Sequence, residues 1–223
     1  TLCLIQLIVH PLILDNRPEV FEPKGSKSAT VLNELRDEFG RDDLFLIVFE
    51  GDVFTRQGCE QLVSEALEVH GRIDCLVSNP AFSRRQTFLN YDPEVFDQTI
   101  QGTLSSGFHM SQLVARHMVE RGGGGKMVFI SSVQGEMAFQ NCVPYCAAKA
   151  GLNHMTRSVA IELAEHKINV NAIEPGWIDT PGEHVTFGDD YIEEQGKLLP
   201  WGRLGTPEDI GNAIVFFASE NAK

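Results

Sequence analysis

Residues 126–163, KMVFISSVQGEMAFQNCVPYCAAKAGLNHMTRSVAIEL, decide the fold. The apolar run at 126–130 is typical of a buried strand, and a loop over 131–142 follows it. Pro144 then opens a helical pattern that continues to Leu163, because proline is favoured in the first turn of a helix. A strand, a loop and a long helix in this order form one repeat of an alternating α/β fold.

The same alternation continues on both sides of this stretch. Apolar strands are predicted at 44–49, 73–77 and 168–173, and helices over 56–70, from 93 to 118 and from 207 to 217. Apolar residues make up 43% of the chain and charged residues 22%, as in ordinary globular proteins. We therefore expect one domain over residues 1–223, a doubly wound, Rossmann-like α/β fold whose parallel sheet lies in three α/β/α layers.

Charge and patterning exclude several classes of protein. A net charge of −13 disfavours binding of nucleic acid through a broad basic surface. The apolar start, Leu2–Leu14, is interrupted by Gln6, His10 and Pro11, so it is too short for a membrane span and fits a pair of strands, or one strand and a linker. It also lacks the features of a signal peptide, which predicts a cytoplasmic protein with no membrane partner.

Two further patterns predict no special site. The five cysteines are an odd number without a disulfide spacing, which favours reduced thiols. Cys142 and Cys146 lie on one helix without a second ligand pair, so we expect no metal site. The Gly122–Gly125 run precedes a strand rather than a helix and is predicted to be a turn, not a phosphate-binding loop.

The chemistry of the chain is predicted to centre on Tyr145, Lys149 and Ser132. Tyr145 and Lys149 are four residues apart on one helix and share a face, so the ammonium can lie close to the phenol. A nearby cation lowers the pKa of a phenol, which makes acid–base catalysis near neutral pH feasible. Ser132 follows a strand, at the edge where open α/β sheets bind ligands, and its hydroxyl could hold a substrate oxygen.

These residues lie within a longer set of segments that resembles the short-chain dehydrogenase/reductase family. The segments occur in the expected order: Gly51–Val53, Asp74–Val77, Phe129–Ser132, Tyr145–Leu152, Asn169–Gly176, Asp179–Thr180 and Trp201–Asp209. The resemblance covers 44–218, leaves 1–43 as an atypical first part, and is strongest to 3-oxoacyl-ACP reductases and glucose dehydrogenases. It implies transfer of hydride between NAD or NADP and a small-molecule carbonyl or alcohol, by a homotetramer built partly through the helices that contain Phe108 and Tyr145.

The resemblance also implies a role for each matching residue. Tyr145 would donate and accept the proton, Lys149 would lower the pKa of Tyr145 and hold the nicotinamide ribose, and Ser132 would orient the substrate. Further residues would line the cofactor: Asp52 and Val53 at the adenine, Asn79 at the adenosine ribose, and Pro175, Gly176, Ile178 and Thr180 along the nicotinamide.

The chain departs from the family pattern at several positions. No glycine precedes Gly25, so the first strand and the glycine-rich pyrophosphate turn are absent or replaced. Asp15, at the end of a possible second strand, would bind the adenosine ribose and favour NAD, although Arg17 keeps NADP open. Thr103 stands where the family has an asparagine, and Pro80 removes a backbone donor from the turn after a strand. With the last strand also missing, we expect a chain cut at both ends.

Two alternatives stay open. A cofactor-independent relative resembling halohydrin dehalogenases would keep the serine and tyrosine, but it would carry arginine where this chain has Lys149. An inactive or binding chain would explain the missing turn. The side chains that select the substrate are predicted to lie in a loop between Asp179 and Trp201 and in residues 134–143. Candidate substrate-facing side chains are Phe139, Trp177, Phe187, Tyr191 and Ile192.

Overall fold

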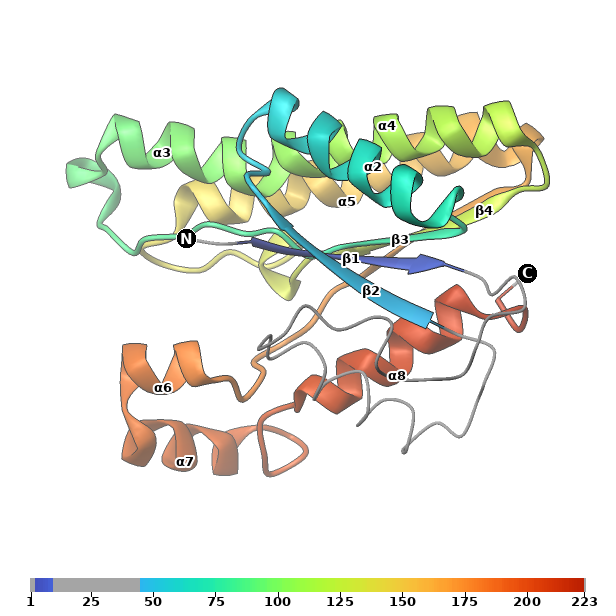
Figure 1. The fold of residues 1–223 in the computed structure, drawn as a ribbon. Coiled ribbons are helices and arrows are strands. Elements are labelled where there is room, and N and C mark those ends of the chain that lie inside the picture. The colour runs from blue at the N-terminus through green and yellow to red at the C-terminus, as the bar shows by residue number, and fades with distance from the viewer. Residues whose placement is uncertain (1–2, 10–44, 223) are drawn as a thin grey trace.

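The computed structural model describes residues 3–9 and 45–222, with side chains from residue 52 onward. Within these ranges, five strands form one sheet in the order β2-β1-β3-β4-β5 (Figure 1). Their bounds are β1 Cys3–Val9, β2 Phe45–Gly51, β3 Cys75–Ser78, β4 Gly125–Ile130 and β5 Ile168–Ile173. The predicted cofactor residue Asp15 and its neighbour Arg17 lie outside the described residues.

The direction of the strands puts four carboxyl ends at one edge of the sheet. β3, β4 and β5 are parallel, with Val77 opposite Val128 and Phe129 opposite Ala172. β1 runs antiparallel to both of its neighbours, so β2 points the same way as β3. The predicted α/β class is confirmed, but β1 departs from the expected parallel order. Its short apolar run suits a buried strand in either direction, so the sequence pattern could not decide between them.

Helices cover both faces of the sheet (Figure 1). One face carries α2 Arg56–His70, α4 Ser106–Arg121 and α5 Val143–Leu163, and the other carries α8 Pro207–Ala218. α3 Pro93–Ile100 runs through a π-helical turn, Gln101–Ser105, into α4. Short 3₁₀ turns occur at Phe88–Asn90, Val133–Gly135 and Ala164–His166.

Each central strand buries both of its faces. Leu76, Met127 and Phe129 pack into a core with α2, α4 and α5. The alternate residues Val77 and Val128 pack with side chains of α8 in a second core. Because neighbouring residues of a strand point to opposite faces, a strand covered on both sides must be apolar throughout, which is why these strands appear in the sequence as unbroken apolar runs.

Local signals fix where the helices begin. Thr55 caps α2, Asp92 caps α3 ahead of Pro93, and Thr206 forms a reciprocal capping box with Asp209 at α8. The prediction of a loop between 179 and 201 was wrong. That segment forms α6 Pro181–Phe187 and α7 Asp189–Leu198, which are separated by Gly188 at a φ of 81°. First-turn Pro181 and the acidic first turn of α7 favour helix there.

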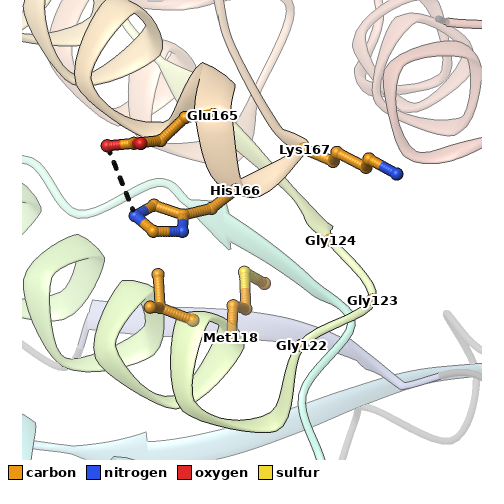
Figure 2. A pocket seen from close by; sticks show the side chains of 8 residues that line it. Met118, Gly122, Gly123, Gly124, Glu165, His166 and Lys167 are labelled. Atoms are coloured by element: carbon orange, nitrogen blue, oxygen red, sulfur yellow. Dashed lines mark ion pairs between the residues drawn. The ribbon is translucent and has the colours of Figure 1, made fainter.

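A pocket of about 310 Å³ lies at the amino edge of the sheet, between the end of α4 and the start of β5. Its rim includes the predicted turn at Gly122–Gly124, where all three glycines have positive φ. Figure 2 shows His166, paired with Glu165 at 3.8 Å, facing Met118 across this pocket. Ligands of open α/β sheets bind at the carboxyl edge, which is the edge opposite to this pocket. No helix in the described ranges is long and apolar enough to cross a membrane.

Candidate active site

Ser132 lies just beyond the carboxyl end of β4, in a segment that is hydrogen-bonded to residues at the end of β5. The Ser131 N–H donates to the Ile173 carbonyl at 2.7 Å, and the Val133 N–H donates to the Pro175 carbonyl at 3.0 Å. The Ser132 hydroxyl accepts a hydrogen bond from the Gln134 N–H at 3.2 Å, which caps the following 3₁₀ turn. This backbone network holds the serine at the carboxyl edge of the sheet.

Tyr145 and Lys149 approach Ser132 from the first two turns of α5. The phenol of Tyr145 shares a hydrogen bond with the Ser132 hydroxyl. The Lys149 side chain is 1% exposed, and its Nζ donates to the Ile130 carbonyl at 2.6 Å. Nζ also lies 5.5 Å from the centre of the Tyr145 ring. The three residues predicted to act together are therefore adjacent in space.

Burial dominates the electrostatics of this trio. Burial lowers the pKa of Lys149 to about 8. The pKa of Tyr145 is raised to about 12, first by burial, while the hydrogen bond with Ser132 acts in the opposite direction and the Glu183 carboxylate adds to the rise. We expected Lys149 to lower the pKa of Tyr145, but the pKa is raised and Lys149 is not among the causes of the shift. The ammonium lies over the ring and bonds Ile130, so it does not offset the desolvation of the phenol.

Thr103, which replaces the expected asparagine, lies in the π-helical turn between α3 and α4 and is buried. Its hydroxyl accepts from the Phe82 N–H at 3.1 Å and lies 3.3 Å from the Phe82 carbonyl. Single π-helical turns often mark functional sites because they displace a helix locally. Here the displaced turn holds the loop that leaves β3 for the active-site edge.

The residues expected at the adenine end of a cofactor are spread along the ends of β2 and β3. Asp52 is exposed, and its carboxylate accepts from the Phe54 N–H at 2.9 Å, so it partly caps its own loop. Val53 is buried in the core, which leaves only its backbone for a ligand. Asn79 is exposed directly after β3.

The residues expected at the nicotinamide end follow β5. Gly176 is exposed with open space around its Cα, and Ile178 forms a parallel bridge with Gly205. Two backbone hydrogen bonds, from Gly205 to Trp177 at 2.9 Å and from Asp179 to Gly205 at 2.8 Å, secure this bridge. Thr180 precedes α6 as its N-cap residue, but its hydroxyl makes no capping hydrogen bond. The Thr180 hydroxyl therefore does not cap α6 and can hydrogen-bond a ligand.

An aromatic cluster forms between the segment that follows β5 and the helices α6 and α7. Trp177, Phe187 and Tyr191 lie with ring centres 5.4 to 6.2 Å apart, so three of the predicted side chains come together. Phe139 is partly exposed on a separate loop, whereas Ile192 is buried and does not line the surface. The Arg85 guanidinium covers the Phe187 ring at 5.2 Å.

Sequence reasoning missed two polar residues of this region. Glu183 accepts from the Trp177 indole N–H at 2.6 Å, and its charge reaches Tyr145. His184 bridges Asp179 and Asp189 at 2.6 Å each, and these hydrogen bonds raise its pKa. Both residues lie on α6, which was expected to be a loop, so no helical spacing pointed to them.

Comparisons with known proteins extend along most of the chain. A family model described as enoyl-(acyl carrier protein) reductase matches residues 22–223. L-rhamnose 1-dehydrogenase (NAD(P)(+)) of Sphingomonas sp. (strain SKA58) is 34% identical over 180 residues, which are 79% of this chain and 70% of that protein. The 3-oxoacyl-(acyl-carrier-protein) reductase MabA of Mycobacterium bovis is 34% identical over 175 residues, 78% of this chain and 69% of that protein. A crystal structure of a short-chain type dehydrogenase/reductase from Mycobacterium marinum superposes with a TM-score of 0.73 at 29% identity, covering 87% of this chain and 76% of that one.

Proposed function

We propose, since this chain belongs to the short-chain dehydrogenase/reductase family, that Tyr145 is the proton donor and acceptor of an NAD(P)-dependent oxidoreductase acting on a carbonyl or alcohol. One observation carries the proposal: the Tyr145 phenol is hydrogen-bonded to Ser132 beside the buried Lys149 ammonium. These groups lie at the carboxyl edge of the sheet, where a substrate and a dinucleotide can meet.

The described residues fit the nicotinamide end of the cofactor. An ammonium has three N–H donors, and the Ile130 carbonyl accepts from Lys149, which leaves donors for ribose hydroxyls. The Thr180 hydroxyl, unused by α6, suits a carboxamide. At the pyrophosphate end, β1 runs antiparallel, so its carboxyl end lies at the edge opposite to Ser78. Nothing in the described ranges therefore supplies a glycine-rich turn there, and the phosphates need another partner.

The bound cofactor would supply or accept the hydride. In carbonyl reduction, Ser132 would donate a hydrogen bond to the substrate oxygen as negative charge develops on it. The phenol of Tyr145, held in its protonated form by burial, would give its proton to that oxygen. Alcohol oxidation needs the phenolate, so it would depend on Lys149 turning from Ile130 toward the phenol and a bound ribose.

The substrate is proposed to contact the cluster of Trp177, Phe187 and Tyr191. Apolar rings would bury the carbon skeleton, while the Glu183 carboxylate near Tyr145 would disfavour an anionic group at that point. The same carboxylate is engaged by the Trp177 indole, so it is fixed in place. We therefore expect neutral carbonyl compounds to be better substrates than short oxo acids.

A homotetramer and a cytoplasmic location remain proposals. Phe108 on α4 and Ile161 on α5 are exposed large apolar residues, which supports association through these helices. Light scattering that gives four protomers supports the tetramer, and a monomer contradicts it. The free thiols of Cys59 and Cys75 suit a reducing compartment, and recovery of the protein from a secreted fraction would count against it.

Exchange of Tyr145 for phenylalanine tests the proposed acid–base role. The purified full chain is assayed for oxidation of NADH or NADPH with a panel of aldehydes and ketones. Tyr145→Phe is expected to lower kcat by roughly 10²- to 10⁴-fold while cofactor binding persists. Tyr91→Phe is the matched control, because the Tyr91 hydroxyl donates to the Arg84 carbonyl and belongs to no part of the proposed site. Equal turnover by Tyr145→Phe and the unmodified chain would remove Tyr145 from the mechanism.

A further inference from the structure

Cys142 is the N-cap residue of α5 and Cys146 lies in its first turn, so the two cysteines flank the proposed catalytic tyrosine, Tyr145. Their sulfur atoms lie 3.6 Å apart. The Cys146 N–H donates to the Cys142 carbonyl at 3.0 Å, so the two residues are one helical turn apart. Residues so spaced have Cα atoms about 6 Å apart, which lies within the range that a disulfide can bridge. The pair therefore needs a local adjustment rather than a large movement to form a bond.

We propose that Cys142 and Cys146 are a redox modification site, at which a reversible disulfide closes around Tyr145 and switches the enzyme off. The inference rests on the proposed function for its effect on turnover, but the formation of the bond does not depend on it. The oxidant would be a hydroperoxide or a small-molecule disulfide.

The two thiols differ in solvent exposure, and the reaction needs one thiol that the oxidant can reach. Cys146 is partly exposed, whereas Cys142 is 1% exposed and burial raises the pKa of its thiol to about 11. Cys146 is thus the thiol that meets an oxidant from solution. Its sulfur also lies 3.8 Å from the Gln134 side-chain oxygen, in the loop that follows Ser132.

The chemistry balances in two steps. The Cys146 thiolate attacks a hydroperoxide oxygen, forming a sulfenic acid and releasing an alcohol or water after protonation. Cys142 then attacks the Cys146 sulfur, forming the S–S bond, and the hydroxyl group leaves with the Cys142 proton as water. Two thiols have lost two electrons in total, and the hydroperoxide has gained them. With a small-molecule disulfide the first step is a mixed disulfide, and the leaving group in the second step is a thiol.

Closure of this bond would displace Tyr145. The sulfur atoms must approach from 3.6 Å to about 2.05 Å, and Tyr145 lies inside the five-residue ring of chain that contracts. The contraction also moves Cys142 away from the Phe139 carbonyl, to which its thiol donates a hydrogen bond at 3.4 Å. It likewise moves Cys146 away from Gln134. Strained disulfides are readily reduced, so the modification would be reversible by an added thiol.

The experiment treats the reduced full chain with diamide and follows three readouts. Differential alkylation with peptide mapping reports the thiols, hydrogen exchange of the peptide over 143–149 reports the helix start, and NAD(P)H turnover reports activity. We expect Cys142 and Cys146 to lose alkylation together, exchange over 143–149 to accelerate, and turnover to fall at least tenfold and recover with dithiothreitol. The thiols of Cys59 and Cys75 serve as internal references, because both are buried in the core.

Cys142→Ser and Cys146→Ala are the matched variants, and each should keep the basal turnover and lose its response to diamide. The proposal is overturned if both thiols stay alkylatable, or if the disulfide forms while exchange and turnover are unchanged. A reduced chain without turnover would instead contradict the proposed function, and peptide mapping and hydrogen exchange would still decide whether the bond forms and moves the helix start.

Discussion

At the scale of single residues, Lys149 is the most constrained side chain of the site. Its ammonium is buried beneath Tyr145, with the Ile130 carbonyl as hydrogen-bond acceptor. Burying a charge is unfavourable unless it is paired or hydrogen-bonded, and the lowered pKa of Lys149 expresses that penalty. A residue kept at such a site at the expense of stability is better explained by binding a ligand than by holding the fold.

This penalty predicts how stability changes with pH. The pKa of Lys149 falls from 10.5 in the unfolded chain to about 8 in the folded chain. Between these values the unfolded chain holds a proton that the folded chain has lost, so the free energy of unfolding should rise with pH. Lys149→Met should remove this rise, which amounts to at most about 3 kcal/mol. Urea unfolding at pH 7.5, 8.5 and 9.5 measures it, and equal slopes in both proteins would contradict the burial of a charged Lys149.

The proximity of Ser132, Tyr145 and Lys149 was predictable from the sequence, but the direction of the Tyr145 pKa shift was not. The i, i+4 spacing of Tyr145 and Lys149 and the position of Ser132 after a strand predicted their proximity, because both depend on local geometry. The direction of the Tyr145 pKa depends on how deeply the phenol is buried, and on Glu183 from a distant helix. These are tertiary properties that spacing along the chain does not encode.

At the scale of elements, the π-helical turn between α3 and α4 connects helix packing to the site. It places Thr103 against Phe82, and Gly102 against the Phe54 ring, where an added Cβ would lie 2.5 Å from a ring carbon. Both contacts hold segments that follow β2 and β3, on the side where the adenine end of a cofactor is expected. The turn is therefore a support for the binding edge rather than an irregularity of the helix.

Thr103→Val tests this support. Valine keeps the shape of threonine but leaves the Phe82 N–H without its buried acceptor, which should lower the free energy of unfolding by about 1 to 3 kcal/mol. It should also raise the KM for the cofactor more than it lowers kcat, because Thr103 acts through the loop and touches no reacting atom. Thr103→Ser, which retains the hydroxyl, should restore both values. Wild-type stability in Thr103→Val would show that the hydrogen bond is dispensable.

Elements with strong local signals were predicted well. β5 and α2 were predicted with the bounds that the structure has, because caps and unbroken apolar runs mark them. α6 and α7 were missed because they are short, amphipathic only in part, and interrupted by Gly188. The antiparallel direction of β1 could not be predicted, because its short apolar run suits a strand in either direction.

At the scale of the whole molecule, the two edges of the sheet have different roles. The carboxyl edge gathers Ser132, Tyr145, Lys149 and the segment after β5, while the amino edge carries the glycine turn and its pocket. Two apolar cores on opposite faces of the same sheet support our proposal that residues 1–223 are one domain. Of this arrangement, the sequence predicted the layered α/β fold and the position of Ser132 at the carboxyl edge, because Ser132 directly follows a strand.

The pyrophosphate end of the cofactor has no counterpart of the family's glycine-rich turn among the described residues. Asp15, the residue that favours NAD, lies outside the described residues, and β1 does not bring a glycine-rich turn to the carboxyl edge. Lys149 and Thr180 can hold the nicotinamide end, but dinucleotides in this class of fold gain much of their affinity from the phosphates. We therefore expect the phosphate contacts, more than those of Lys149 and Thr180, to decide how tightly the chain binds a cofactor.

Calorimetric titration of the reduced full chain with NADH and with NADPH is the decisive test of the proposed NAD(P)-dependent activity. We expect at least one of them to bind with a Kd on the order of micromolar, NADH more tightly if Asp15 meets the ribose, and binding to weaken when Lys149 is replaced by methionine. A folded chain that binds neither cofactor would contradict the assignment as an NAD(P)-dependent oxidoreductase.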